Sequence, residues 1–155
     1  MYDVVVVYPL HAVDGSVSVL LGEKRTGLGV GRIVGPGGKV EPGEDLRSAA
    51  IRELREEVGI TLDPDDLTPI ARIAYPFVGR PALSQRSHAF TVSVPTLHAS
   101  TSEELRPEWF ALTEIPWTRM WSDASLWLPR ALAGEFIDWT ITIGRDDEVI
   151  EVISA

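Results

Sequence analysis

Three glutamates lie close together in the sequence, at Glu53, Glu56 and Glu57. The surrounding residues 46–58 include no Gly or Pro and carry an apolar residue at every fourth position, so we predict a helix there. At 3.6 residues per turn, spacings of three and four place the three carboxylates on one helical face. Like charges at these spacings destabilise a helix in water, so something positive should compensate them. A divalent cation that prefers oxygen ligands, Mg²⁺ or Mn²⁺, fits best.

The segment GPGGK, ahead of this helix, adds groups that suit a phosphate. Its glycines let backbone N–H and C=O groups approach a ligand, and Lys39 supplies a cation for a phosphate. Glu44 could join the acidic cluster, and Arg52 could pair with a neighbouring carboxylate and orient it. Together these groups fit metal-assisted hydrolysis of a phosphoanhydride, in which a bound water is acidified and a spare carboxylate takes its proton. The alternative is that E-x-x-E-E is the solvated face of an ordinary helix.

The composition narrows the class of partner. The chain has 155 residues, which fit one domain over residues 1–155, and its 23 acidic against 14 basic residues give a formal net charge of −9. Such a chain repels a nucleic acid polymer and accepts a small, metal-chelated anion more readily. The lack of cysteine excludes disulfides, thiolate nucleophiles and Cys-ligated metal sites, and it agrees with the cytoplasmic location that we expect. No obligate protein partner is inferred.

Strands are expected where β-branched and apolar residues gather. The first is the apolar run MYDVVVVYPL, which is too short to span a bilayer and has no basic region or cleavage site of a signal peptide, so we expect no membrane partner. The expected strands are residues 3–8, 16–21, 70–75, 87–94 and 108–112, followed by a hairpin of residues 135–143 and 148–153. The glycine-rich residues 22–43 are expected to form a long functional loop with a short strand at most.

Two helices are expected between these strands. The helix over residues 46–58 should end at Gly59, a glycine in the position that commonly follows a helix. A second helix over residues 122–133 should be capped by Asp123 and stopped by Gly134, with Trp127 among its apolar residues, packed in the core or on the surface. Helices mixed with antiparallel pairs of strands indicate the α+β class.

Nine residues match the pattern G-x5-E-x7-R-E-U-x-E-E-x-G-U, where U is a bulky aliphatic residue. They are Gly38, Glu44, Arg52, Glu53, Leu54, Glu56, Glu57, Gly59 and Ile60. The pattern resembles the box of the Nudix hydrolases without a departure. The resemblance implies an α/β/α sandwich around a mixed β-sheet, with the box as a loop–helix–loop. It also implies Mg²⁺ on Glu53, Glu56 and Glu57 beside the box glycine Gly38, and water attack on a nucleoside diphosphate linked to another group.

The residues from Leu20 to Pro129 are similar to one branch of that family, the oxidised purine nucleoside triphosphatases. The similarity is carried by LLGEKRTGLGVGRIVGPGGKVEPGE, EELRPEWFALTEIPW and MWSDASLWLP. It implies that a tryptophan stacks on the purine and a following aspartate bonds its edge, that two aromatic residues line the pocket, and that one glutamate outside the box assists the metal site. The matching residues are Trp121, Asp123, Tyr75, Phe77 and Glu104.

Two positions depart from the pattern of that branch. Val34 stands where the branch has a base-reading Asn, and Ala124 replaces the second of its paired Asp residues. An apolar wall discriminates bases weakly, so a broader or different set of substrates is expected. Lys24, Arg25 and Arg32 could steer a triphosphate, or they could be solvated charges of the loop. Packing in the core is the alternative role for Trp121.

The favoured function is a Mg²⁺-dependent nucleoside triphosphate pyrophosphohydrolase that acts on oxidised purine nucleotides such as 8-oxo-dGTP, an 8-oxo-dGTP diphosphatase. A second hypothesis is hydrolysis of ADP-ribose or another nucleoside diphosphate derivative, with Pro76 as its hint. A third is a nucleotide-sensing module without turnover. The complete set of glutamates disfavours the third, because such a module has no need of a destabilising acidic face.

Overall fold

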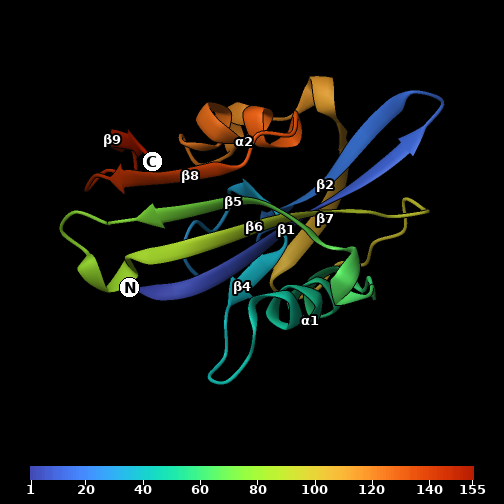
Figure 1. Ribbon diagram of the computed structural model, residues 1–155, viewed down its shortest axis with the longest axis horizontal. Helices are drawn as coiled ribbons and strands as arrows, with labels where there is room; N and C mark the ends of the chain where they lie inside the picture. Colours follow the sequence, from blue (N-terminus) through green and yellow to red (C-terminus); the bar gives the residue numbers. More distant parts are fainter.

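The computed structural model describes residues 1–155 as one mixed sheet of nine strands with two α-helices (Figure 1). The strands are β1 (Tyr2–Val13), β2 (Ser16–Lys24), β3 (Ile33–Val34), β4 (Gly37–Lys39), β5 (Thr68–Tyr75), β6 (Gln85–Ser93), β7 (Leu105–Ala111), β8 (Ile137–Ile143) and β9 (Val149–Ser154). The helices are α1 (Leu46–Val58) and α2 (Ala124–Leu132). Short 3₁₀ turns occupy Pro64–Asp66, Pro81–Leu83, Leu112–Glu114 and Trp117–Arg119.

The sheet has the strand order β3-β2-β1-β6-β5-β8-β9, with β4 paired to β1 and β7 paired to β2. β1 pairs in parallel with β6, and β5 pairs in parallel with β8, while the other pairs are antiparallel. The long strand β1 serves two partners along one edge, because its first half pairs with β4 and its second half with β2. The pairing with β4 holds the glycines of GPGGK against the middle of the sheet.

One helix covers each face of the sheet, with α2 above the strands and α1 below them in Figure 1. Alternation along β1 divides its side chains between two hydrophobic clusters. Val5 and Val7 pack with Leu54 of α1, whereas Tyr8 packs with Trp127 and Leu128 of α2. This is the α/β/α arrangement around a mixed sheet that the resemblance implied. Neither helix is long and apolar enough to cross a membrane.

Helix α1 has the bounds expected from the sequence, and local capping explains both ends. Asp45 accepts a hydrogen bond from the backbone N–H of Ser48 at 2.8 Å, which satisfies an otherwise free donor of the first turn. At the other end Gly59 has φ of 73°, and its N–H donates to the carbonyl of Arg55. The helix is therefore defined by residues within and beside it.

Three local predictions were wrong. Residues 22–43 contain two short strands, β3 and β4, because β2 and β1 offer them partners. Helix α2 is shorter than expected, and the side chain of Asp123 makes no capping hydrogen bond. Its carboxylate is bonded to side chains of the pocket described below.

Candidate active site

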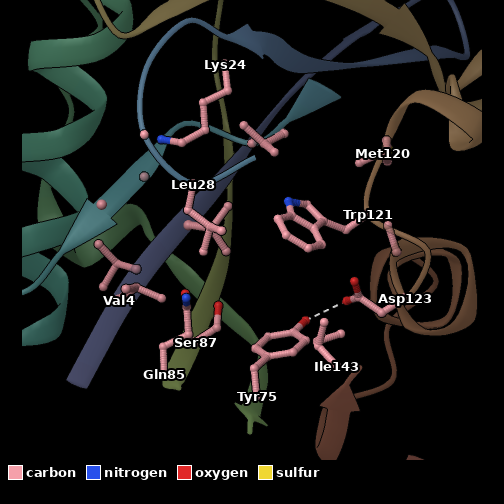
Figure 2. Close-up of a pocket in the computed structure, with 18 of the residues that line it drawn as sticks. Val4, Lys24, Leu28, Tyr75, Gln85, Ser87, Met120, Trp121, Asp123 and Ile143 are labelled. Atoms are coloured by element: carbon pink, nitrogen blue, oxygen red, sulfur yellow. Dashed lines mark hydrogen bonds between the residues drawn. The ribbon is translucent and has the colours of Figure 1, made fainter. Parts of the chain in front are cut away.

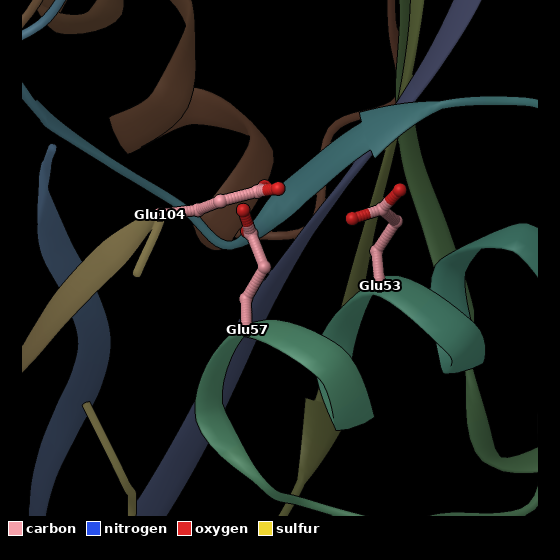
Figure 3. A group of neighbouring side chains, drawn as sticks. All are labelled: Glu53, Glu57 and Glu104. Carbon is pink, nitrogen blue, oxygen red and sulfur yellow. The ribbon is translucent and has the colours of Figure 1, made fainter. Parts of the chain in front are cut away.

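Three carboxylates converge beside the start of β7. Glu53 and Glu57 come from α1, Glu104 comes from the segment before β7, and one oxygen from each lies within 4.8 Å of the others (Figure 3). Glu53 is 8% exposed and Glu57 is 4% exposed, whereas Glu104 is exposed. Burial of acidic groups this close together is unfavourable without a compensating charge.

The backbone of β4 and one arginine hold the two buried carboxylates. The N–H of Gly37 donates to Oε1 of Glu57 at 2.8 Å, and a guanidinium nitrogen of Arg52 donates to Oε1 of Glu53 at 2.9 Å. A Cβ atom at Gly38 would fall on the carboxylate of Glu53, so the position has no room for a side chain. The box glycine therefore lets β4 lie directly against the acidic group.

Burial favours the protonated form of the two buried carboxylates. Burial raises the pKa of Glu57 to about 8, contact with Glu104 and the charge of Glu53 raise it as well, and the Gly37 N–H and Lys24 oppose the rise. Burial also raises the pKa of Glu53, against the opposing effect of Arg52. An all-oxygen set of clustered carboxylates suits Mg²⁺ or Mn²⁺, whose charge would replace these protons. The residues present therefore fit a hard divalent cation.

Glu44 lies outside this group, contrary to the expectation that it could join it. Arg52 donates to both of its carboxylate oxygens at 2.8 Å, through Nε and through a terminal nitrogen. Hydrogen bonding to Arg52 lowers the pKa of Glu44 to about 2. Arg52 thus binds Glu44 in a two-point pair and orients Glu53, as the sequence suggested for its role.

Glu56 also lies outside the group of three. Helical geometry explains its place, because Glu53 and Glu57 are about 40° apart around the axis while Glu56 is about 60° away on the other side of Glu53. Its side chain is half-exposed and lies 3.3 Å from a terminal nitrogen of Arg52. A role for Glu56 as a metal ligand stays a prediction.

A cavity of about 520 Å³ adjoins the acidic group. Figure 2 shows Lys24 and Val4 on one side of it and Trp121 and Asp123 on the other. Most of the residues that the sequence suggested for substrate binding line it, namely Lys24, Val34, Lys39, Tyr75, Phe77, Trp121 and Asp123. Arg25 and Arg32, suggested for steering the phosphates, do not line it. Gly37 and Gly38 line it as well, so the cavity extends from the backbone that holds the carboxylates to the aromatic residues.

Asp123 is an acceptor buried in the cavity wall. It is 5% exposed, and its Oδ2 accepts a hydrogen bond from the Tyr75 hydroxyl at 2.6 Å (Figure 2). The same oxygen accepts a second hydrogen bond, from Nε1 of Trp127 at 2.9 Å. Burial raises its pKa, and the two donors oppose the rise. Trp127, for which the sequence predicted only packing in the core or on the surface, therefore also orients this aspartate. The spacing of four residues between Asp123 and Trp127 was the signal in the sequence.

Trp121 is half-buried and held from two sides. The guanidinium carbon of Arg32 lies 4.4 Å from the centroid of its ring, and Phe77 meets it edge-on at 6.1 Å. A Cβ atom at Gly29 would come within 2.9 Å of the indole nitrogen. Arg32 is thus stacked on Trp121, which the sequence did not predict. Lys39 is exposed, with its Nζ 4.7 Å from the ring centroid of Tyr2.

Comparison with known proteins identifies the family. The model of the NUDIX domain matches residues 1–131. The chain is 42% identical to the mouse (Mus musculus) oxidized purine nucleoside triphosphate hydrolase over 125 residues, which cover 81% of this chain and 78% of the relative. The zebrafish (Danio rerio) protein of that name is 42% identical over 114 residues, covering 74% and 71%.

A solved structure supports the same fold. The crystal structure of the mutator MutT protein from Bacillus halodurans superposes with a TM-score of 0.79 at 22% identity, over 99% of this chain and 97% of that one. At that identity the likeness concerns the fold alone. From the box residues, the sandwich fold and the matched domain together, we conclude that the chain belongs to the Nudix family of hydrolases.

Proposed function

We propose that residues 1–155 act as one domain that hydrolyses nucleoside triphosphates to a monophosphate and pyrophosphate, with oxidised purine nucleotides such as 8-oxo-dGTP as substrates. One observation carries the proposal: a single cavity joins the glycines that support the acidic group to an aromatic pocket with a buried aspartate. A purine nucleotide has the same two parts, a charged phosphate chain and a flat base with a polar edge. The names of the mouse and zebrafish relatives agree with this substrate.

At the phosphate end, Glu53, Glu57 and Glu104 would hold Mg²⁺, or Mn²⁺ in its place, with Glu56 as a further candidate ligand. When bound, the cation neutralises phosphate oxygens and lowers the pKa of a water. Arg52 and the Gly37 N–H keep Glu53 and Glu57 in place, while Lys24 and Lys39 bring positive charge to the phosphates. Glu104 would offer one carboxylate oxygen to the cation, and no arginine or backbone amide binds its side chain. Its second oxygen is therefore our candidate for taking the proton of the attacking water.

At the base end, Trp121 offers a stacking surface and Asp123 an acceptor for the base edge. Val34 and Ala124, the two departures from the oxidised purine branch, both line this cavity. They remove two polar groups from its wall, so we expect a wider range of purine substrates than a site with those groups would accept. A cytoplasmic location and the absence of an obligate protein partner stay predictions from the sequence.

A nucleotide panel tests the proposal. Purified protein with Mg²⁺ would be given dGTP, 8-oxo-dGTP, 2-oxo-dATP and ADP-ribose, and the products identified. We expect pyrophosphate and a monophosphate, with the oxidised purines giving the highest kcat/KM. Glu57→Gln serves as the variant that should lose turnover, and Glu151→Gln, an exposed residue of β9, as its matched control. Preferred cleavage of ADP-ribose, or turnover that survives Glu57→Gln, would overturn the proposal.

A further inference from the structure

Tyr8 has no part in the family resemblance, yet the fold places it in the cavity wall. Alternation along β1 points it toward α2, where its ring meets Trp127 edge-on with centroids 6.1 Å apart. On another side it adjoins Gly35, where an added Cβ would come within 2.9 Å of its Cε1 atom. The side chain is 5% exposed. Its ring is therefore held in one position by β1, α2 and the segment before β4.

The hydroxyl of Tyr8 has no hydrogen-bond partner within the protein. The other two tyrosines use theirs, since Tyr2 donates to the carbonyl of Leu83 and Tyr75 donates to Asp123. No fully buried polar side-chain atom of the structure lacks a partner, so the Tyr8 oxygen must keep contact with solvent. Because Tyr8 lines the cavity, that contact is with the interior of the cavity. A nearly buried ring thus presents one unused polar atom to whatever binds there.

The chemical character of this atom follows from its surroundings. Burial raises the pKa of Tyr8 above its ordinary value, and the nearby charge of Asp123 raises it further, so the hydroxyl keeps its proton at neutral pH and can donate it. Asp123 complements it. Both hydrogen bonds that other side chains make to Asp123 end on Oδ2, which leaves Oδ1 available as an acceptor. The base end of the cavity therefore presents a free donor and a free acceptor.

We propose that Tyr8 is a specificity-determining residue, whose hydroxyl donates a hydrogen bond to an acceptor atom of the base while Asp123 accepts one from a neighbouring N–H. This rests on the proposed function, because it assumes that the base of a nucleotide enters the cavity. The pair matches a base edge with an N–H donor beside an acceptor. Such an edge occurs in the lactam of guanine and of oxidised purines and in the amidine of adenine, but not on their C–H edges. Val34, on the same cavity wall, offers the base no hydrogen bond.

Removal of a single oxygen atom tests the proposal. Tyr8→Phe removes the hydroxyl and retains the ring, and calorimetry would measure binding of two monophosphates. One is 8-oxo-dGMP, and the other is indole deoxyriboside monophosphate, whose fused ring can stack but has no hydrogen-bond acceptor. Loss of one neutral hydrogen bond corresponds to about three- to tenfold weaker binding. We expect that loss for 8-oxo-dGMP and a change of less than about twofold for the indole nucleotide. For 8-oxo-dGTP, kcat/KM should fall because KM rises while kcat changes little.

Tyr2→Phe is the matched control, because it removes a tyrosine hydroxyl that is already engaged within the protein. It should leave the ratio of the two affinities unchanged. Tyr8→Phe should unfold at the temperature of the wild type, since it breaks no internal hydrogen bond. Unchanged binding of 8-oxo-dGMP, or an equal loss for both ligands, would overturn the role of Tyr8. Failure of the wild type to release pyrophosphate from any purine triphosphate would instead overturn the proposed function.

Discussion

Glu57→Gln should stabilise the metal-free protein while it abolishes turnover. Burial raises the pKa of Glu57 from an ordinary 4.5 to about 8, so the folded state holds a proton that the unfolded state releases above pH 4.5. The sign follows from linkage: the stability tied to this proton is fully present below pH 4.5 and is lost as the pH rises toward 8. Glutamine is neutral at every pH and removes this loss.

The magnitude follows from the same shift. At about 1.4 kcal/mol per pKa unit, the wild type loses up to about 3 kcal/mol between pH 4.5 and pH 7. Glutamine keeps an oxygen to accept from the Gly37 N–H, although it no longer shares a proton with Glu104. We therefore expect Glu57→Gln to be more stable at pH 7 by about 1–3 kcal/mol, or about 3–8 °C in Tm for a domain of this size.

Thermal unfolding in EDTA from pH 5 to pH 8.5 would measure this effect. The stability of the wild type should decline across that range relative to Glu57→Gln, and Mg²⁺ should restore it in the wild type only. Glu151→Gln, at an exposed residue of β9, is the control for the loss of one carboxylate. Glu57→Gln unfolding below the wild type at pH 8 in EDTA would refute the reasoning.

Three further substitutions test other parts of the site. Arg52→Lys keeps the positive charge, but a lysine cannot make the two-point bond to Glu44 and also hold Glu53. The affinity for Mn²⁺, measured by titration, should therefore fall about tenfold. An unchanged affinity would contradict this role of Arg52. Trp121→Ala should raise KM with little change in kcat, because the base loses a stacking surface that contributes about 1–3 kcal/mol to binding. An unchanged KM would return Trp121 to a packing role. Burial raises the pKa of Asp123, so the stability linked to its proton falls as the pH rises above about 4. Asp123→Asn should flatten that decline in chemical denaturation and lower kcat/KM for purine triphosphates. An unaltered pH profile would count against this role of Asp123.

Features set by neighbouring residues were predictable from the sequence. The bounds of α1 follow from its apolar spacing, from Asp45 at its start and from Gly59 at its end. The box residues identified the family before any fold was known. The same spacing brings Glu53 and Glu57 together, because residues four apart stack along a helix.

Features set by distant parts of the chain were not predictable in the same way. Asp123 stands at a position typical of a helix cap, but Tyr75 on β5 supplies a competing hydrogen-bond donor that no local pattern reveals. The strand β4 exists because β1 pairs with it. Tyr8 looked like one more residue of an apolar run, and only the strand order and the position of α2 turn its hydroxyl toward the cavity.

The central claim is that the carboxylates of Glu53, Glu57 and Glu104 hold the divalent cation that serves a nucleotide bound in the adjoining cavity. The most direct measurement is anomalous diffraction from a crystal grown with Mn²⁺ and a non-hydrolysable analogue of 8-oxo-dGTP. We predict a Mn²⁺ peak among these three carboxylates and the purine stacked on Trp121. A crystal with the nucleotide bound but no Mn²⁺ among the carboxylates would contradict the claim.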